Sequence, residues 1–133
     1  ILSGSAMANE VIIKNSSKQP IPVRFQLAYR NPGQTVVLKP SAESVTSLNH
    51  PIRIRFASDG YKNAGVVVLA VKKGLYENKW HTLPASARQF DVKPGCWMKT
   101  DKKSFSRTIY LSYQKDPENT KRGRITCSTY PIR

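Results

Sequence analysis

The chain has 133 residues, which suits one domain, because a second hydrophobic core would be hard to fill at this length. It carries 22 Lys and Arg against 8 Asp and Glu, a net charge of +14 that should attract polyanions. A hydrophobic content of 39% argues against disorder, and no apolar run reaches the length of a transmembrane segment.

The beginning of the chain has the composition of an expression-tag remnant over residues 1–8 (ILSGSAMA). We therefore expect a single domain over residues 9–133, which begins almost inside its first strand. A start of this kind is what removal of a signal peptide or a lipoprotein leader would leave. The sequence thus favours an exported protein, extracellular or periplasmic.

The first half of the chain predicts strands between turn residues. Val11–Lys14 is a short apolar run, followed by Asn15-Ser16-Ser17, which favours a turn and matches an N-glycosylation acceptor. Val23–Tyr29 and Ile52–Phe56 both alternate apolar with polar side chains, the period of a strand with one buried face. The less regular candidates in this half are Thr35–Leu38 and Glu43–Leu48.

The second half begins with Gly65–Val71, a continuous β-branched apolar run that predicts a strand buried on both faces. Lys72–Leu83 is expected to be a loop with room for one helical turn. The remaining strand candidates are Arg88–Val92, Cys96–Thr100, Thr108–Gln114 and Arg124–Tyr130. About eight to nine short strands with little helix predict an all-β protein, an antiparallel β-sandwich.

The two cysteines, Cys96 and Cys127, favour one disulfide and hence an oxidising compartment. Such a bond would close a loop of about 30 residues and stabilise the domain by about 3 kcal/mol in the chain-entropy model. The alternative is a pair of reduced, buried thiols. With no Cys-x-x-Cys pattern and two histidines in the chain, we expect no metal site and no cofactor.

Catalytic motifs of the common enzyme classes do not occur. A nucleophile could use only His50 or His81 as its base, and both histidines lie in turn or loop segments. Asp116 and Glu118 flank a proline in a polar turn, which is a poor setting for a raised carboxyl pKa. The sequence therefore predicts a protein that is not an enzyme.

Basic side chains offer two candidate binding surfaces. Arg53 and Arg55 point the same way from one strand, and Arg24 could join them if the two strands pair. The alternative role for this face is a solvated surface that discourages edge aggregation. A second set belongs largely to two loops that we expect to form one basic rim: Lys99, Lys102, Lys103, Arg107, Lys115, Lys121, Arg122 and Arg124. Trp80 is the candidate interface aromatic, because basic residues flank it.

These features favour an exported binding protein that engages an anionic envelope or host-surface partner through its basic loops. The partner would be lipopolysaccharide, an acidic glycan or anionic lipid. One alternative is a structural subunit of a bacterial envelope or secretion assembly that acts through protein–protein contacts. A second alternative is a nucleic-acid-binding protein, although the alternating strands offer only Tyr110 as an outward aromatic.

Overall fold

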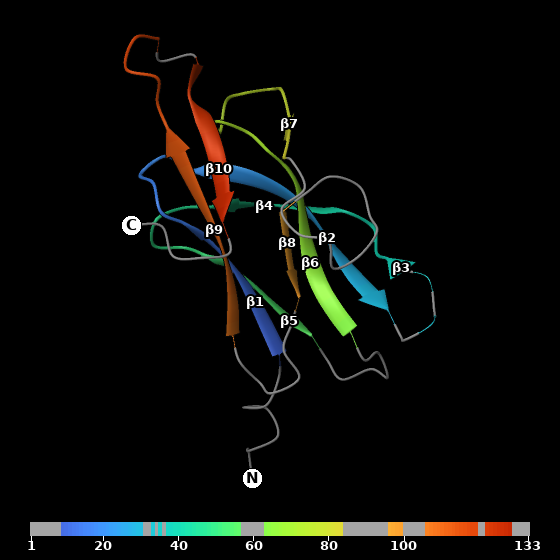
Figure 1. Ribbon diagram of the computed structural model, residues 1–133. Coiled ribbons are helices and arrows are strands. Elements are labelled where there is room, and N and C mark those ends of the chain that lie inside the picture. Colours follow the sequence, from blue (N-terminus) through green and yellow to red (C-terminus); the bar gives the residue numbers. More distant parts are fainter. Residues whose placement is uncertain are drawn as a thin grey trace.

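The computed structural model describes residues 9–30, 33, 35, 37–56, 63–83, 96–99, 106–119 and 122–128. These residues form ten β-strands in two sheets (Figure 1). Sheet A consists, in order, of β10 (Arg124–Ser128), β9 (Ser106–Gln114), β1 (Asn9–Asn15) and β5 (Ile52–Phe56). Sheet B runs β3 (Val37–Leu38), β2 (Ile21–Arg30), β6 (Asn63–Val71) and β7 (His81–Thr82). The predicted all-β sandwich is confirmed.

Sheet B has two edges that are each built from a pair of short strands. On one edge, β3 and β4 (Ala42–Thr46) both pair with β2. On the other edge, β7 and β8 (Cys96–Lys99) both pair with β6. Edges broken in this way present no long unpaired strand to another chain.

Sheet A brings together strands from the two ends of the described chain. β1 pairs parallel with β9, with Val11 opposite Arg107, and antiparallel with β5, where Val11 faces Ile54. β10 pairs antiparallel with β9 and places Arg124 opposite Gln114. As a result, the β9–β10 connection lies at the end of sheet A where β1 leads into β2.

The hydrophobic core lies between the two sheets. Apolar side chains at alternate positions point into it, as the period of a strand requires. Sheet A contributes Val11, Ile13, Ile54, Ile109 and Leu111, and sheet B contributes Ile21, Val23, Val66, Val68 and Val71, with Leu83 beside them. These buried side chains form one cluster, so the sandwich has one shared core.

Strand β6 contains an irregularity that changes which side chains face the core. Arg24 pairs with Ala70 and Phe25 with Val68, so Leu69 has no partner residue in β2. The extra residue shifts the alternation, and Val71 joins the core that Val68 already faces. Val67 points the other way and is also buried, which confirms that β6 is buried on both faces.

Strand pairing corrects one prediction about the arginines. Arg24 lies on β2 in sheet B, whereas Arg53 and Arg55 lie on β5 at the edge of sheet A. Arg24 instead forms an ion pair with Glu43 at 2.9 Å, because β2 pairs with β4. The three arginines therefore do not form one cluster.

Two segments also differ from their predicted form. The strand expected over Thr35–Leu38 is limited to Val37–Leu38 among the described residues. The connection after β6 contains a turn and ends in β7, and none of its described residues is helical. The strand predicted over Arg88–Val92 lies outside the described residues.

The turn after β1 is built around a buried amide. The Asn15 side chain donates hydrogen bonds to the carbonyl oxygens of Gln19 and Thr46, at 2.7 and 3.1 Å. Its oxygen accepts from the backbone N–H and the hydroxyl of Ser17. Asn15 is fully buried, so the glycosylation acceptor suggested by the sequence has no accessible side-chain nitrogen in the folded protein.

Candidate anion-binding site

The β6–β7 and β9–β10 connections lie at the same end of the sandwich (Figure 1). A pocket of about 220 Å³ joins them, and its lining comes from both sheets. Val71 of β6, His81 of β7 and Arg124 of β10 all reach it, together with Lys73. The site is therefore a product of the sandwich packing rather than of one loop.

The charge of this pocket is positive. Lys73 and Arg124 carry this charge, and His81, Thr82 and the apolar side chains of Val71, Leu83 and Ile125 complete the described lining. No carboxylate is among these described lining residues. Amino and guanidinium groups beside an apolar floor favour a bound anion, because poor solvation strengthens their field.

A second pocket of about 220 Å³ lies on the other side of Arg124, which lines both. Its remaining lining residues are Gln114, Lys115, Asp116 and Arg122. The Asp116 carboxylate accepts a hydrogen bond from the backbone N–H of Glu118 at 2.9 Å. This pocket therefore has a carboxylate among its cations, and that carboxylate already bonds to its own turn.

Glu77 fixes the shape of the β6–β7 connection. Its carboxylate accepts a hydrogen bond from the backbone N–H of Lys73 at 2.7 Å and forms an ion pair with His81. Burial raises the pKa of this carboxyl, but the hydrogen bonds and charges of His81 and Lys73 outweigh that effect and leave the pKa below its ordinary value. Glu77 therefore stays ionised at neutral pH and holds two of the pocket residues in place.

Trp80, predicted to be an interface aromatic, is half-buried on the outer face of sheet B. The guanidinium carbon of Arg24 lies 4.2 Å from the centre of a Trp80 ring, and the Lys72 amine lies 4.7 Å from a Trp80 ring. Such stacking orders both cations and the loop that carries them. Trp80 therefore helps to hold the Lys72 side chain and the β6–β7 connection in place.

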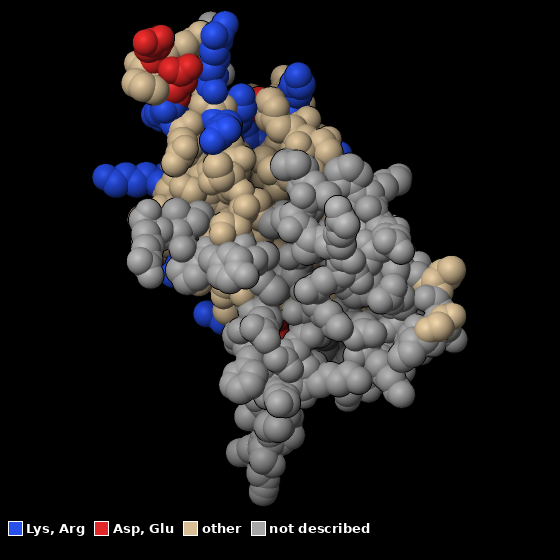
Figure 2. Space-filling view, in the orientation of Figure 1, with Lys and Arg blue, Asp and Glu red and all other residues tan. Residues whose placement is uncertain are grey.

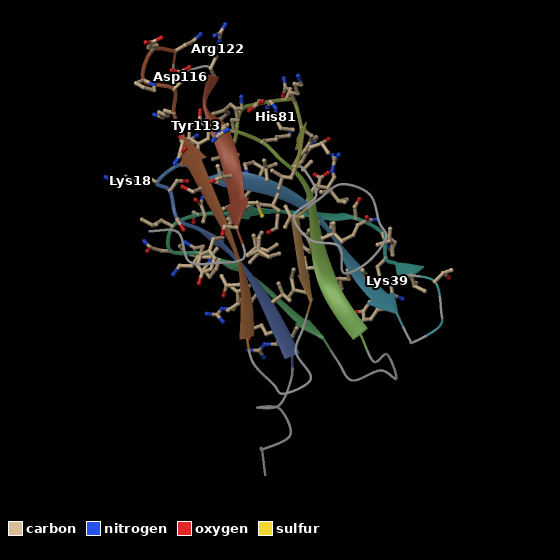
Figure 3. All side chains as sticks on the ribbon, viewed as in Figure 1. Lys18, Lys39, His81, Tyr113, Asp116 and Arg122 are labelled. Atoms are coloured by element: carbon tan, nitrogen blue, oxygen red, sulfur yellow. The ribbon has the colours of Figure 1, made fainter. Side chains whose placement is uncertain are left out.

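The described basic residues of the β6–β7 connection, the β9–β10 connection and the start of β10 are Lys72, Lys73, Lys79, Lys115, Arg122 and Arg124, which we call the basic end. Figure 2 shows Lys and Arg gathered here around a small acidic tip, and Figure 3 places His81 and Arg122 at this end and Lys39 well away from it. Lys115, Arg122 and Arg124 belong to the basic rim expected from the sequence, whereas Lys72, Lys73 and Lys79 do not. The only sequence signal of these three lysines was positive charge in an irregular loop.

Other predicted binding residues lie elsewhere or outside the description. Arg107 is the second residue of β9, opposite Val11, whereas Arg124 faces Gln114 at the far end of that strand, about 23 Å away at 3.3 Å per residue. The single basic rim expected from the sequence therefore does not include Arg107. Lys102, Lys103 and Lys121 lie outside the described residues.

The arginine pair on β5 is separate from the basic end. Arg53 forms an ion pair with Glu10 at 2.9 Å across β1 and β5, and Arg55 is exposed next to it on the edge strand. Because Glu10 already neutralises part of this face, Arg53 is less available to an external anion. The role of this pair in binding stays a prediction.

The two histidines occupy unrelated places. His50 lies on an exposed turn, where its Nδ1 is 3.2 Å from the Ser47 hydroxyl, and His81 is bound to Glu77. The described part of the chain contains no group of three or more His, Cys, Asp and Glu side chains placed to hold a metal ion. Nor does it contain a helix long and apolar enough to cross a membrane.

The cysteines lie on different sheets. Cys127 is on β10 in sheet A and packs, partly buried, against the core. Cys96 begins β8, which pairs with β6 in sheet B. The side chain of Cys96 lies outside the described atoms, so the pairing of Cys96 with Cys127 stays a prediction.

No family model and no curated protein matches the chain. Two solved structures resemble its fold, one titled "Trapped Toxin" and one of a disulfide-locked mutant of intermedilysin with human CD59. They share 9% identity with this chain, have TM-scores of 0.42 and 0.41, and match over 92% and 93% of it. The chain spans about a quarter of either structure's length (24%). At these scores the likeness carries no functional conclusion.

Proposed function

We propose that this protein is a non-enzymatic, exported binding protein that holds an anionic partner at its basic end. The observation that carries the proposal is the convergence of Lys73, His81 and Arg124 on one pocket from two sheets. Charges on separate elements are held at fixed spacing by the sandwich. Fixed spacing is what distinguishes a binding site from the general positive charge of the surface.

The charges near the pocket favour an anion over a cation. The carboxylates at this end are Glu77, Asp116 and Glu118 among the described residues. Glu77 is paired with His81 and Asp116 bonds to the backbone of Glu118, which leaves the basic end with an excess of positive charge. A guanidinium such as that of Arg124 can bind phosphate, sulfate or carboxylate with two hydrogen bonds.

The test is the affinity for a soluble polyanion, with heparin as the probe, measured at several salt concentrations. Replacing Lys73 and Arg124 with Ala should weaken binding by about tenfold or more and reduce its dependence on salt. Lys39→Ala is the matched control, because Lys39 is exposed and lies well away from the basic end. It removes one positive charge and should leave the affinity within about twofold.

Each outcome separates this proposal from its rivals. An equal loss for Lys39→Ala and for the pocket variants would mean that overall charge alone attracts heparin, and the site would be rejected. Binding that persists undiminished at high salt would also contradict an anion site. Much tighter binding of single-stranded DNA than of heparin would favour the nucleic-acid alternative.

A further inference from the structure

A turn in the β6–β7 connection presents two apolar side chains to solvent. The backbone N–H of Glu77 donates to the carbonyl oxygen of Gly74 at 3.4 Å, so Leu75 and Tyr76 are the two central residues of a β-turn. Tyr76 is 96% exposed and Leu75 is 51% exposed. A large aromatic side chain that is almost wholly in water is uncommon without a partner.

The backbone of this turn is docked on the rest of the protein. Gly74 is buried against Gln19, and a Cβ at this position would lie 2.7 Å from the Gln19 amide nitrogen. The backbone N–H of Lys72 donates to the carbonyl oxygen of Pro22 at 3.0 Å, and Glu77 fixes the backbone of Lys73. The exposure of Leu75 and Tyr76 is therefore a property of an ordered turn.

Lysines surround these two apolar residues. Lys72 and Lys73 precede the turn and Lys79 follows it, within one connection. A tyrosine at the level of the headgroups, a leucine at the acyl boundary and lysines facing anionic headgroups are the contacts that hold a peripheral protein at a bilayer. A soluble glycan would use the lysines but would leave Leu75 without an apolar partner.

We propose that the turn Gly74–Glu77 docks this protein on an anionic lipid bilayer, with Leu75 and Tyr76 entering the interface and the basic end contacting lipid phosphates. This inference rests on the proposed function and names its partner. The acidic tip formed by Asp116 and Glu118 belongs to the β9–β10 connection, where Lys115 and Arg122 lie close to Asp116 around one pocket. The β6–β7 connection is therefore the part that faces the lipid.

The test compares the effect of each substitution on binding to lipid vesicles with its effect on binding to heparin. Sedimentation with vesicles of phosphatidylcholine containing about 30% phosphatidylglycerol measures docking, and phosphatidylcholine alone is the neutral reference. Replacing Leu75 and Tyr76 with Ser should weaken vesicle binding by about tenfold while leaving heparin binding unchanged. Val37→Ser is the matched control. Val37 lies on β3 and is 43% exposed. It pairs with Tyr29, near the end of β2 that is distant from the basic end.

A second measurement reports insertion directly. In the Tyr76→Trp variant, fluorescence should be quenched by brominated acyl chains in the anionic vesicles and not in the neutral ones. Undiminished vesicle binding by the Ser variant, or no additional quenching over the wild-type protein, would overturn membrane docking while the heparin result still supports the proposed function. If Lys73→Ala with Arg124→Ala alters neither heparin nor vesicle binding, the proposed function itself fails.

Discussion

The fully buried side chain of Asn15 provides hydrogen bonds to the backbone of the turn that follows β1. Two carbonyl oxygens and one backbone N–H, together with the Ser17 hydroxyl, have their hydrogen bonds completed by this one amide. Because buried polar groups left without partners are costly, the amide ties the end of β1 to β4 through Thr46. The hydrogen-bonding groups of Asn15 therefore contribute more to the stability of the turn than the volume of its side chain does.

Replacing Asn15 with Ala should lower the free energy of unfolding by about 3 kcal/mol, since Gln19 and Thr46 would each lose a donor to their carbonyl oxygens. Urea denaturation followed by far-ultraviolet circular dichroism measures the change. Ser16→Ala, at an exposed neighbouring position, should stay within about 0.5 kcal/mol of the wild type. Equal stabilities for the two variants would show that water replaces the amide.

Gly123 is a second position where the residue type matters, because the space around it leaves no room for a Cβ atom. A Cβ there would lie 2.3 Å from the Tyr113 hydroxyl and 2.9 Å from the carbonyl oxygen of Gln114. We expect Gly123→Ala to destabilise the protein by about 2 kcal/mol, because the backbone leading into β10 must move. Thermal unfolding measures the loss. In a Tyr113→Leu background the same substitution should cost less, and an unchanged cost would show that the tyrosine is not the obstacle.

At the scale of elements, the β6–β7 connection depends on the ionisation of one carboxylate. The pKa of Glu77 in the folded protein lies below its ordinary value of 4.5. The ionised form therefore adds stability above about pH 4.5, and this contribution is lost as the pH falls through the lower folded-state pKa. The connection should be most firmly held at neutral pH.

Glu77→Gln tests this dependence because glutamine does not titrate. The difference in unfolding free energy between wild type and variant should be largest near pH 6 and should shrink towards pH 3. Urea unfolding across that range measures it. A difference that does not change with pH would mean that Glu77 acts only through its shape and hydrogen bonds.

The elements themselves were readable from the sequence where burial has a period of two. Ile52–Phe56 matches β5 residue for residue, and Val23–Tyr29 falls inside β2. The pairing of strands was not readable, because it is set by contacts between distant residues. Arg24 was expected to join Arg53 only if their strands paired, and its strand pairs instead with β4 and β6. The bulge at Leu69 likewise has no local sequence signal.

At the scale of the whole molecule, the candidate site exists only after the sheets have packed. Arg124 and Arg122 could be singled out as loop charges, but Lys73 and His81 come from a segment far from them in the sequence. Only the sandwich places Lys73, His81 and Arg124 around one pocket. Composition therefore predicts an anionic partner, while the location of the candidate site required the fold.

A cross-link between Cys96 and Cys127 would join the two sheets, because β8 belongs to sheet B and β10 to sheet A. The unreduced protein should have a mass about two units below the reduced form and should resist alkylation. Reduction should lower the free energy of unfolding by about 3 kcal/mol in the chain-entropy model. Two thiols that react without reduction would contradict both the cross-link and the expected oxidising compartment.

The parallel pairing of β1 with β9 also has a consequence for the order of folding. β1 can meet β5 early, but its other edge stays open until β9 has been synthesised and has returned to it, with Val11 opposite Arg107. Closing so long a loop is slow, and an open edge can pair with a neighbouring chain in the meantime. The nascent protein is therefore most prone to aggregation before β9 emerges, and sheet A is the last part of the sandwich to be completed.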